Sequence, residues 1–225
     1  MTPFSVVIPA AGKSVRFGGS SNKLFESLAG RSILQRALDP FLARPDVVEI
    51  IIPCNDEQAI RKTLGETTDG RIRFCAGGPS RAHSVLAGVR LTRPEVGLVA
   101  IHDAARPLLS QEIIDRTLMA AEIRGAAVPA MPVYLTVKEA IGPLPARVLR
   151  TIPRQTLWTM QTPQIIRRRA LLEAFDCCPL SLDQVTDDVQ LIELSGGEVW
   201  LVDGEERNLK ITTQMDLLLA ERLLA

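Results

Sequence analysis

Residues 8–19, IPAAGKSVRFGG, combine small residues with cations in a pattern typical of phosphate binding. Within them, Gly12-Lys13-Ser14 matches the end of the P-loop pattern G-x-x-x-x-G-K-[ST], in which backbone N–H groups surround the phosphates. The first glycine of that pattern would fall at Val7, inside the apolar run FSVVIPA. A β-branched residue of a buried strand cannot open such a loop, so the P-loop interpretation is excluded.

The dinucleotide-binding pattern G-x-G-x-x-G is excluded as well. Aligned on Gly12, it finds Ser14 and Phe17 at its two remaining glycine positions. What remains is a buried strand followed by small residues and the cations Lys13, Arg16 and Lys23. This arrangement still suits a phosphate ligand, held by a different kind of loop.

The apolar runs of the chain predict the sheet that must position these residues. Buried strands are expected at 4–10, 47–53, 71–77, 97–103 and 125–130. Helical spacing predicts a helix over 32–43, kinked at Pro40, and another that begins at the N-cap Ser110. Thr213 and Asp216 form a capping-box pattern before a C-terminal helix. Strands and helices that alternate in this way predict an α/β fold, with a largely parallel sheet covered on both faces.

Ligands of such sheets bind beyond the carboxyl ends of the strands. We therefore expect residues 10–23, 77–84 and 103–106 to meet at one edge of the sheet. Asp103 ends a buried strand there, where a carboxylate is costly unless it has a partner. A structural ion pair with Arg106 is the alternative to a role in binding. We expect the neighbouring His102 to be a core residue.

Residues 132–154 interrupt the α/β rhythm. Two extended stretches rich in Val, Thr and Pro flank the turn GPLPAR, which predicts a β-hairpin. A two-stranded hairpin is marginal alone in water, and its apolar residues need a surface to pack on. We expect a single domain over 1–225, whose arm at about 132–154 packs on a partner subunit.

Composition excludes several classes of partner. The 225 residues contain 26 Lys and Arg against 26 Asp and Glu, so no global positive field attracts nucleic acid or anionic lipid. No apolar run approaches the ~20 residues that span a bilayer, and no signal peptide is recognised at the N-terminus. The four cysteines lack metal-ligand spacing and are expected to be buried or half-buried thiols. These features predict a cytoplasmic protein with neither nucleic-acid nor membrane partners.

Five clusters carry a resemblance to a known family. They are AAGKSVRF with NKLF (10–25), GGPSRAHSVLAGV (77–89), IHDAARP (101–107), TLWTMQTPQ (156–164) and ERNLKITT (206–213). In order and spacing they resemble the 2-C-methyl-D-erythritol 4-phosphate cytidylyltransferases of the non-mevalonate isoprenoid pathway. The resemblance covers nearly the whole chain. It implies a Rossmann-like nucleotidyltransferase domain with a protruding β-hairpin arm, in a homodimer whose arms complete one another's sites.

The resemblance also implies the roles of individual residues. Nucleotide binding falls to Ala10, Ala11, Gly12, Gly77, Gly78, Ser84 and Asp103. Catalysis falls to Arg16, Lys23, Arg154 and Lys210, and binding of the sugar-alcohol phosphate to Arg106, Thr136, Thr162 and Thr186. Asp103 is also a candidate ligand for Mg²⁺, which would otherwise be held by the CTP phosphates. Lys13 has no counterpart in the family and is interpreted as a surface lysine.

The implied reaction joins CTP and 2-C-methyl-D-erythritol 4-phosphate, giving the CDP-alcohol and pyrophosphate. The chain departs from the family pattern at two positions. Pro79 replaces an acidic residue common after the two glycines, and Leu135 replaces the usual aspartate before Thr136. These departures leave two alternatives open: a cytidylyltransferase for another alditol phosphate, such as ribitol 5-phosphate, and a non-catalytic nucleotide-binding module.

Overall fold

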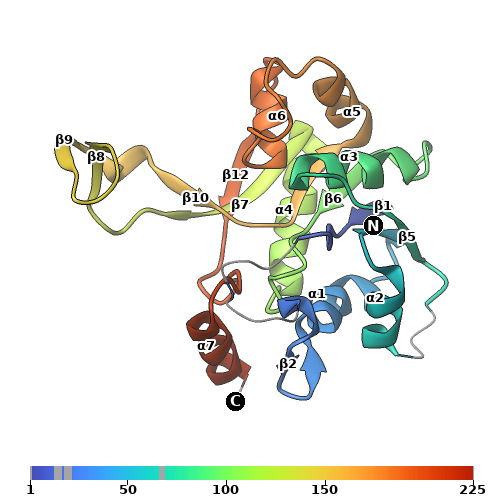
Figure 1. Ribbon diagram of the computed structural model, residues 1–225. Coiled ribbons are helices and arrows are strands. Elements are labelled where there is room, and N and C mark those ends of the chain that lie inside the picture. The colour runs from blue at the N-terminus through green and yellow to red at the C-terminus, as the bar shows by residue number, and fades with distance from the viewer. Residues whose placement is uncertain (1, 13–16, 18–21, 66–68, 225) are drawn as a thin grey trace.

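The computed structural model describes residues 2–12, 17, 22–65 and 69–224 (Figure 1). The strands are β1 (Phe4–Val7), β2 (Ser27–Leu28), β3 (Arg31–Ser32), β4 (Val47–Cys54), β5 (Ile72–Ala76), β6 (Leu98–Ile101), β7 (Ala126–Pro132), β8 (Val137–Ile141), β9 (Arg147–Ile152), β10 (Trp158–Met160), β11 (Gln164–Arg167) and β12 (Trp200–Asp203). The α-helices are α1 (Ile33–Leu42), α2 (Glu57–Leu64), α3 (Arg81–Leu91), α4 (Gln111–Arg124), α5 (Arg168–Asp176), α6 (Asp188–Leu194) and α7 (Gln214–Leu224). The described residues also form the short 3₁₀ turns η2 (Lys23–Phe25) and η3 (Arg154–Thr156).

One 8-stranded sheet organises the molecule, in the order β10-β7-β11-β6-β1-β4-β5 with β12 beside β7. β1 pairs in parallel with both β4 and β6, and β4 pairs in parallel with β5. β11 is antiparallel to both β6 and β7, and β10 is antiparallel to β7. The sheet is thus mostly parallel, as predicted, with antiparallel strands confined to the half that leads to the arm.

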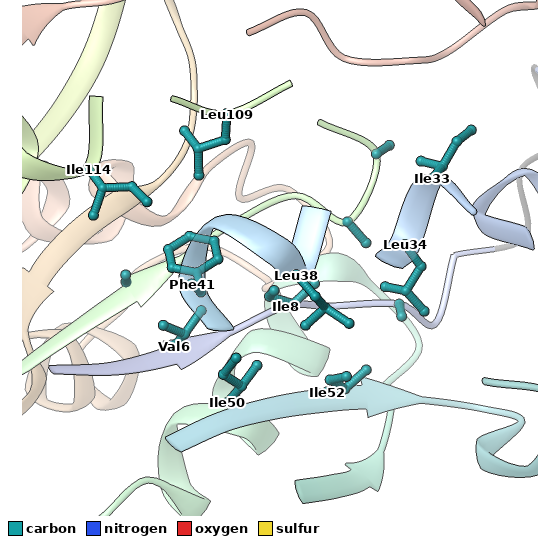
Figure 2. Packing of buried hydrophobic residues seen from close by; sticks show 14 of the residues in the cluster. Val6, Ile8, Ile33, Leu34, Leu38, Phe41, Ile50, Ile52, Leu109 and Ile114 are labelled. Carbon is teal, nitrogen blue, oxygen red and sulfur yellow. The ribbon is translucent and has the colours of Figure 1, made fainter. Parts of the chain in front are cut away.

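Helices cover both faces of the sheet. Successive side chains of a strand point to opposite faces, so the apolar residues of each central strand pack against helices on both sides. On one face Val6 and Ile50 pack with α1, α2 and α4 (Figure 2). On the other, Val7 and Ile51 pack with α3, α5 and α6. This two-sided burial explains why the central strands are continuous apolar runs rather than alternating ones.

The predicted helix ends are confirmed. Ser110 Oγ accepts a hydrogen bond from Ile113 N (3.2 Å) at the start of α4. Before α7, Thr213 N donates to Asp216 Oδ2 (2.7 Å), and Asp216 N donates back to Thr213 Oγ1 (3.3 Å). α1 continues through Pro40 to Leu42, since a proline this close to the end of a helix removes only a late backbone hydrogen bond.

Two parts of the sheet differ from the prediction. β5 was expected to be buried but is an edge strand, and its residues are half-buried or exposed. The strands β10, β11 and β12 were not predicted. Their apolar stretches are short, and Arg167 and Trp158 interrupt or border them with exposed side chains.

The predicted hairpin is present and projects far from the body of the molecule (Figure 1). β8 and β9 pair only with each other, in a separate two-stranded sheet. Large apolar side chains are exposed along this arm: Tyr134, Leu135, Ile141, Leu144, Val148 and Leu149. The described chain thus gives the arm no hydrophobic core of its own.

The four cysteines are free, as expected, but they differ in exposure. Cys54 is buried and Cys75 and Cys178 are half-buried, whereas Cys177 is exposed, contrary to the prediction. Among the described residues, no helix combines the length and the apolar character that a bilayer crossing requires.

Candidate functional site

A cleft of about 760 Å³ opens where the parallel strands end. Its walls come from the loops after β1, β4, β5 and β6, which meet at this edge because the strands run the same way. These loops supply residues 9–12, Asn55, residues 78–81 and residues 103–105, with Lys23 and Lys210 reaching the same space. The structure therefore brings together the described parts of the three segments that the sequence analysis expected at one edge.

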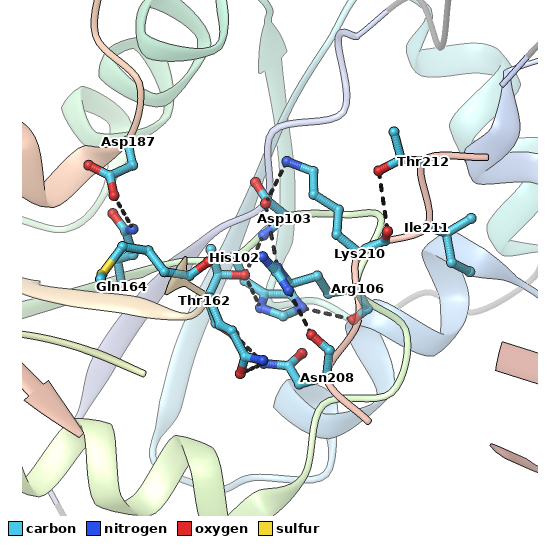
Figure 3. Close-up of polar contacts among 12 residues, drawn as sticks. His102, Asp103, Arg106, Thr162, Gln164, Asp187, Asn208, Lys210, Ile211 and Thr212 are labelled. Atoms are coloured by element: carbon cyan, nitrogen blue, oxygen red, sulfur yellow. Dashed lines mark hydrogen bonds and ion pairs between the residues drawn. The ribbon is translucent and has the colours of Figure 1, made fainter. Parts of the chain in front are cut away.

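Asp103 is the charged centre of this cleft. Its carboxylate contacts Lys210 Nζ at 2.9 Å, Arg81 Nε at 3.1 Å and Arg106 Nε at 3.7 Å. Figure 3 shows Asp103 with Lys210 and Arg106. Burial alone would raise the pKa of this carboxyl. The attraction of Arg81, Lys210 and Arg106 outweighs that effect and lowers the pKa well below its ordinary range. Asp103 is therefore ionised, within a local excess of positive charge.

His102 and Thr162, both buried on the side of Asp103 away from the cleft, hold its backbone through hydrogen bonds (Figure 3). His102 Nε2 lies 3.1 Å from the carbonyl oxygen of Arg106, which can only accept, so Nε2 carries the proton. Nδ1 is then an acceptor, and the Thr162 hydroxyl donates to it at 3.0 Å. Thr162 Oγ1 in turn accepts from Asp103 N at 3.1 Å. Burial lowers the pKa of His102 to about 4, so the ring is neutral at pH 7.

Lys23 and Lys210 are tied to the loop that carries Asp103. Ile211 N donates to Ala105 O (2.8 Å), which holds the segment after Asn208 against that loop. Lys23 Nζ donates to Ile211 O at 2.7 Å. Lys23 belongs to η2 and Lys210 to the segment before α7, and both residues line the cleft. These hydrogen bonds hold the two segments against the loop of Asp103.

The glycine turn after β5 is held by hydrogen bonds from its own helix. Ser84 Oγ accepts from Gly78 N (3.0 Å) and donates to Ser80 O (3.0 Å). A side chain at Gly77 would overlap the Cβ of Ala11 and come within 3.0 Å of Asn55 Oδ1. Only glycine lets this turn approach the loop after β1 so closely. The residues Ala10, Ala11, Gly12, Gly78 and Ser84 line the cleft, whereas Gly77 is not part of its lining.

Two predicted substrate-binding residues lie behind the cleft wall. Arg106 is 9% exposed and donates to Asn208 O (2.6 Å) and to Met160 O (3.3 Å). Thr162 is 3% exposed, and its hydroxyl proton is engaged by His102. In this structure both residues support the loop that carries Asp103 (Figure 3).

The other predicted substrate residues lie apart from the cleft. Thr136 is exposed on the arm, and Arg154, at the base of the arm, donates to Tyr134 O. Thr186 is exposed before α6, where its hydroxyl contacts Gln190 Oε1 at 3.1 Å. None of the three lines the cleft of its own chain. Arg16 and Lys13 lie outside the described residues.

Sequence reasoning assigned no role to Asn55, Arg81 and Thr212, which all line the cleft. Asn55 Nδ2 donates to Ala11 O (3.1 Å) and so joins the loops after β4 and β1. Arg81 lies within the quoted cluster GGPSRAHSV, so its position beside the glycine turn was a usable signal. Its two carboxylate partners are 22 and 107 residues away in the sequence, a pairing that no local pattern reveals.

The cleft offers one carboxylate to a metal ion. In the described part of the chain, no three His, Cys, Asp or Glu side chains gather as a metal site. A single carboxylate fits Mg²⁺, which usually takes one or two protein carboxylates together with substrate phosphates and water. Asp103 fits this role because it is ionised and lines the cleft.

A mostly parallel sheet with a glycine turn, lysines and an ionised carboxylate at its carboxyl edge defines a Rossmann-like nucleotide-binding enzyme. Comparison with known proteins identifies the enzyme family. A family model described as "IspD: 2-C-methyl-D-erythritol 4-phosphate cytidylyltransferase" matches residues 4–225. The chain belongs to this family of nucleotidyltransferases.

Relatives and solved structures agree with this assignment. The chain is 39% identical to the 2-C-methyl-D-erythritol 4-phosphate cytidylyltransferase of Symbiobacterium thermophilum, over 99% of this chain and 93% of that protein. It is 37% identical to the chloroplastic enzyme of Oryza sativa, over 98% and 74% of the two chains. The crystal structure of the Thermus thermophilus enzyme superposes with a TM-score of 0.79 at 34% identity, covering 99% of this chain and 98% of that one.

Proposed function

We propose that this chain transfers the cytidylyl group of CTP to 2-C-methyl-D-erythritol 4-phosphate and releases pyrophosphate. Family membership supports the reaction. The observation that supports this cleft as its site is the ionised Asp103 held between Lys210 and Arg81. An excess of fixed positive charge suits phosphoryl transfer, which depends on positioning and charge stabilisation.

In this proposal the cytosine lies against the glycine turn and the phosphates lie toward the lysines. Neither Gly77 nor Gly78 carries a side chain that would keep a pyrimidine ring away from the backbone of this turn. Because Gly78 N already donates to Ser84 Oγ, the other backbone groups of the turn would meet the base. Lys23 and Lys210, which both line the cleft, are proposed to meet the triphosphate. Arg16 is proposed to join them, on the family resemblance.

The nucleophile is a phosphate oxygen of the sugar-alcohol phosphate. It forms a bond to the α-phosphorus of CTP, while the bond from that phosphorus to the bridging oxygen breaks and pyrophosphate leaves. A phosphate monoester has its second pKa near ~6 and is mostly dianionic at neutral pH, so it needs no general base. His102 supports this route, because both of its ring nitrogens are engaged in the wall behind Asp103.

We propose that Mg²⁺ is bound by Asp103 and the CTP phosphates. The ion would offset the charge of the phosphates and of the leaving pyrophosphate. The protein's part is to keep Asp103 ionised and oriented, through Arg81 on one oxygen and Lys210 on the other.

The chain is proposed to act as a homodimer in which the arm of one subunit completes the cleft of the other. Leu135 is 80% exposed and Leu144 is 90% exposed, more apolar surface than an isolated ribbon of two strands normally carries. Thr136 lies on this arm and Arg154 at its base, and neither lines the cleft of its own chain. A two-fold contact would bury the arm and bring both residues to the partner's substrate.

We also propose that the protein is cytoplasmic. Its support is that all four cysteines are free thiols, which suits a reducing compartment.

Pyrophosphate release tests the proposal. CTP and Mg²⁺ are combined with the phosphates of methylerythritol, ribitol and a hexose, and we expect turnover with methylerythritol 4-phosphate. Faster turnover with ribitol 5-phosphate would assign the chain to another alditol, as Leu135 and Pro79 allow. CTP binding without pyrophosphate release from any of them would indicate a non-catalytic module.

A further inference from the structure

Asp188, the first residue of α6, is a buried carboxylate outside the cleft wall. Its side chain is 1% exposed, and Oδ2 contacts Arg81 NH2 at 2.8 Å. Its other oxygen, Oδ1, has no hydrogen-bond partner among the described residues. A carboxylate this deeply buried is costly, so its pairing with a residue of the cleft wall calls for a reason.

We propose that Asp188 is a positioning residue that holds Arg81 against Asp103, and so orients the carboxylate that faces the substrates. The inference rests on the proposed function for its kinetic consequence, though not for its geometry. Arg81 bridges the two carboxylates, with Nε on Asp103 Oδ1 (3.1 Å) and NH2 on Asp188 Oδ2 (2.8 Å).

The backbone of Asp188 is itself anchored. Gln164 Oε1 accepts from Asp188 N (2.8 Å) and Val189 N (3.0 Å), and Gln164 Nε2 donates to Asp187 Oδ2 (3.1 Å; Figure 3). Gln164 is 1% exposed and belongs to β11, which pairs with β6 just before His102 and Asp103. Asp188 is thereby fixed to the same strands that carry the cleft.

Arg81 needs such an anchor because of its position at the N-terminus of α3. It is the first residue of α3, and a cation at a helix N-terminus is disfavoured by the helix dipole. Two carboxylates compensate, and the planar guanidinium reaches both at once. Because Arg81 occupies Oδ1 of Asp103, the other oxygen is presented to Lys210 at 2.9 Å. Without Asp188, Arg81 would be free to rotate and to take both oxygens of Asp103.

The test uses Asp188→Asn, Arg81→Gln, the double variant and a matched control. Glu49→Gln makes the same change in a carboxylate that is also 1% exposed and pairs with Arg73, far from the cleft edge of the sheet. We expect Asp188→Asn to lower kcat/KM roughly 10-fold, the scale seen when an outer partner of an active-site ligand is removed. Glu49→Gln should lower the Tm with kcat/KM unchanged.

The double-mutant cycle separates positioning from simple structural support. If Asp188 acts through Arg81, the double variant loses no more kcat/KM than the worse single variant. Losses that multiply would overturn the proposal. If Asp188→Asn does not fold, Arg81→Lys replaces it in the test, because a lysine cannot reach both carboxylates. A wild-type kcat/KM in Arg81→Lys would also overturn the proposal.

A readout without turnover keeps this inference distinct from the proposed function. The ¹H–¹⁵N signal of Arg81 Nε–H reports its hydrogen bond to Asp103 directly. We expect this signal to shift and to exchange faster in Asp188→Asn, and to stay unchanged in Glu49→Gln. An unchanged signal in Asp188→Asn overturns the positioning role. A wild-type protein that shows the expected signals, yet releases no pyrophosphate, overturns the proposed function alone.

Discussion

Lys210 Nζ lies 2.9 Å from Asp103 Oδ2, although 107 residues separate the two in the chain. Lys210 is 38% exposed in its side chain and Asp103 10%, so the pair sits at the boundary between the protein interior and the cleft. The lysine balances the charge of the carboxylate, and its side chain is accessible enough for the contact with a substrate phosphate that we propose.

The first prediction concerns the two cleft lysines. Lys210→Ala and Lys23→Ala should each lower kcat by roughly 10²–10³, the usual cost of one electrostatic contact to a transition state. Lys62→Ala, an exposed lysine of α2, is the matched control and should leave kcat unchanged. Steady-state pyrophosphate release measures all three. Equal losses at Lys62 and at the cleft lysines would show that the effect is not local.

The second prediction concerns the glycine turn. A methyl group at Gly77 would overlap Ala11 and crowd Asn55, so Gly77→Ala should push the turn into the nucleotide site and weaken CTP binding. Gly97→Ala meets no atom within 4 Å and is the matched control. Isothermal titration with CTP should show an affinity loss of roughly 10-fold or more for Gly77→Ala, the equivalent of ~1.4 kcal/mol. Equal affinities for the two variants would remove this turn from the nucleotide site.

The third prediction follows from the neutral His102. Its pKa is about 4 in the folded protein and about 6.5 in an unfolded chain. Below pH 6.5 the unfolded chain takes up a proton that the folded protein refuses, so stability falls as the pH drops toward 4. Between pH 7.5 and 5 this group should remove about 2 kcal/mol from the free energy of unfolding. Urea unfolding of wild type and His102→Gln should show this loss in the wild type alone; the same loss in both would assign it to other groups.

The fourth prediction concerns the pH dependence of turnover. If the phosphate dianion attacks unaided, kcat/KM should rise through the ionisation of the substrate near ~6 and stay flat above neutrality. His102→Asn should leave this acidic limb in place, because the imidazole ring supports the loop of Asp103 and is not the general base of the reaction. A limb that shifts in a folded His102→Asn variant would point to a base supplied by the protein.

The sequence revealed those parts of the site that depend on local pattern. β1, β4 and β6 are continuous apolar runs because helices cover both sheet faces, and the residues that follow them could therefore be placed at one edge. β11 was missed because its buried part, QII, is too short to distinguish from a loop. Its antiparallel position between β6 and β7 depends on long-range pairing.

Contacts between residues distant in sequence could not be predicted. Thr162 was assigned to substrate, but its hydroxyl proton is directed to His102, a partner 60 residues away. Arg81 lies beside the glycine turn, yet its buried partner Asp188 is 107 residues away in the sequence. Residue type and spacing identify which side chains can bind a phosphate, whereas tertiary packing determines which of them face the cleft.

The last prediction tests the shared site. In a homodimer with exchanged arms, Thr136 serves the partner's cleft, whereas Lys23 serves the cleft of its own chain. Thr136→Arg and Lys23→Ala should each be nearly inactive alone, the first by blocking the substrate pocket and the second by removing the phosphate contact. Mixed and allowed to exchange subunits, they should form heterodimers in which one site contains two defects and the other contains none. Recovery of up to about half of the wild-type activity per heterodimer is expected, because the intact halves act at one shared site. Absence of recovery, with heterodimers confirmed by native mass spectrometry, would contradict arm exchange, and so would a monomer in sedimentation at micromolar concentration.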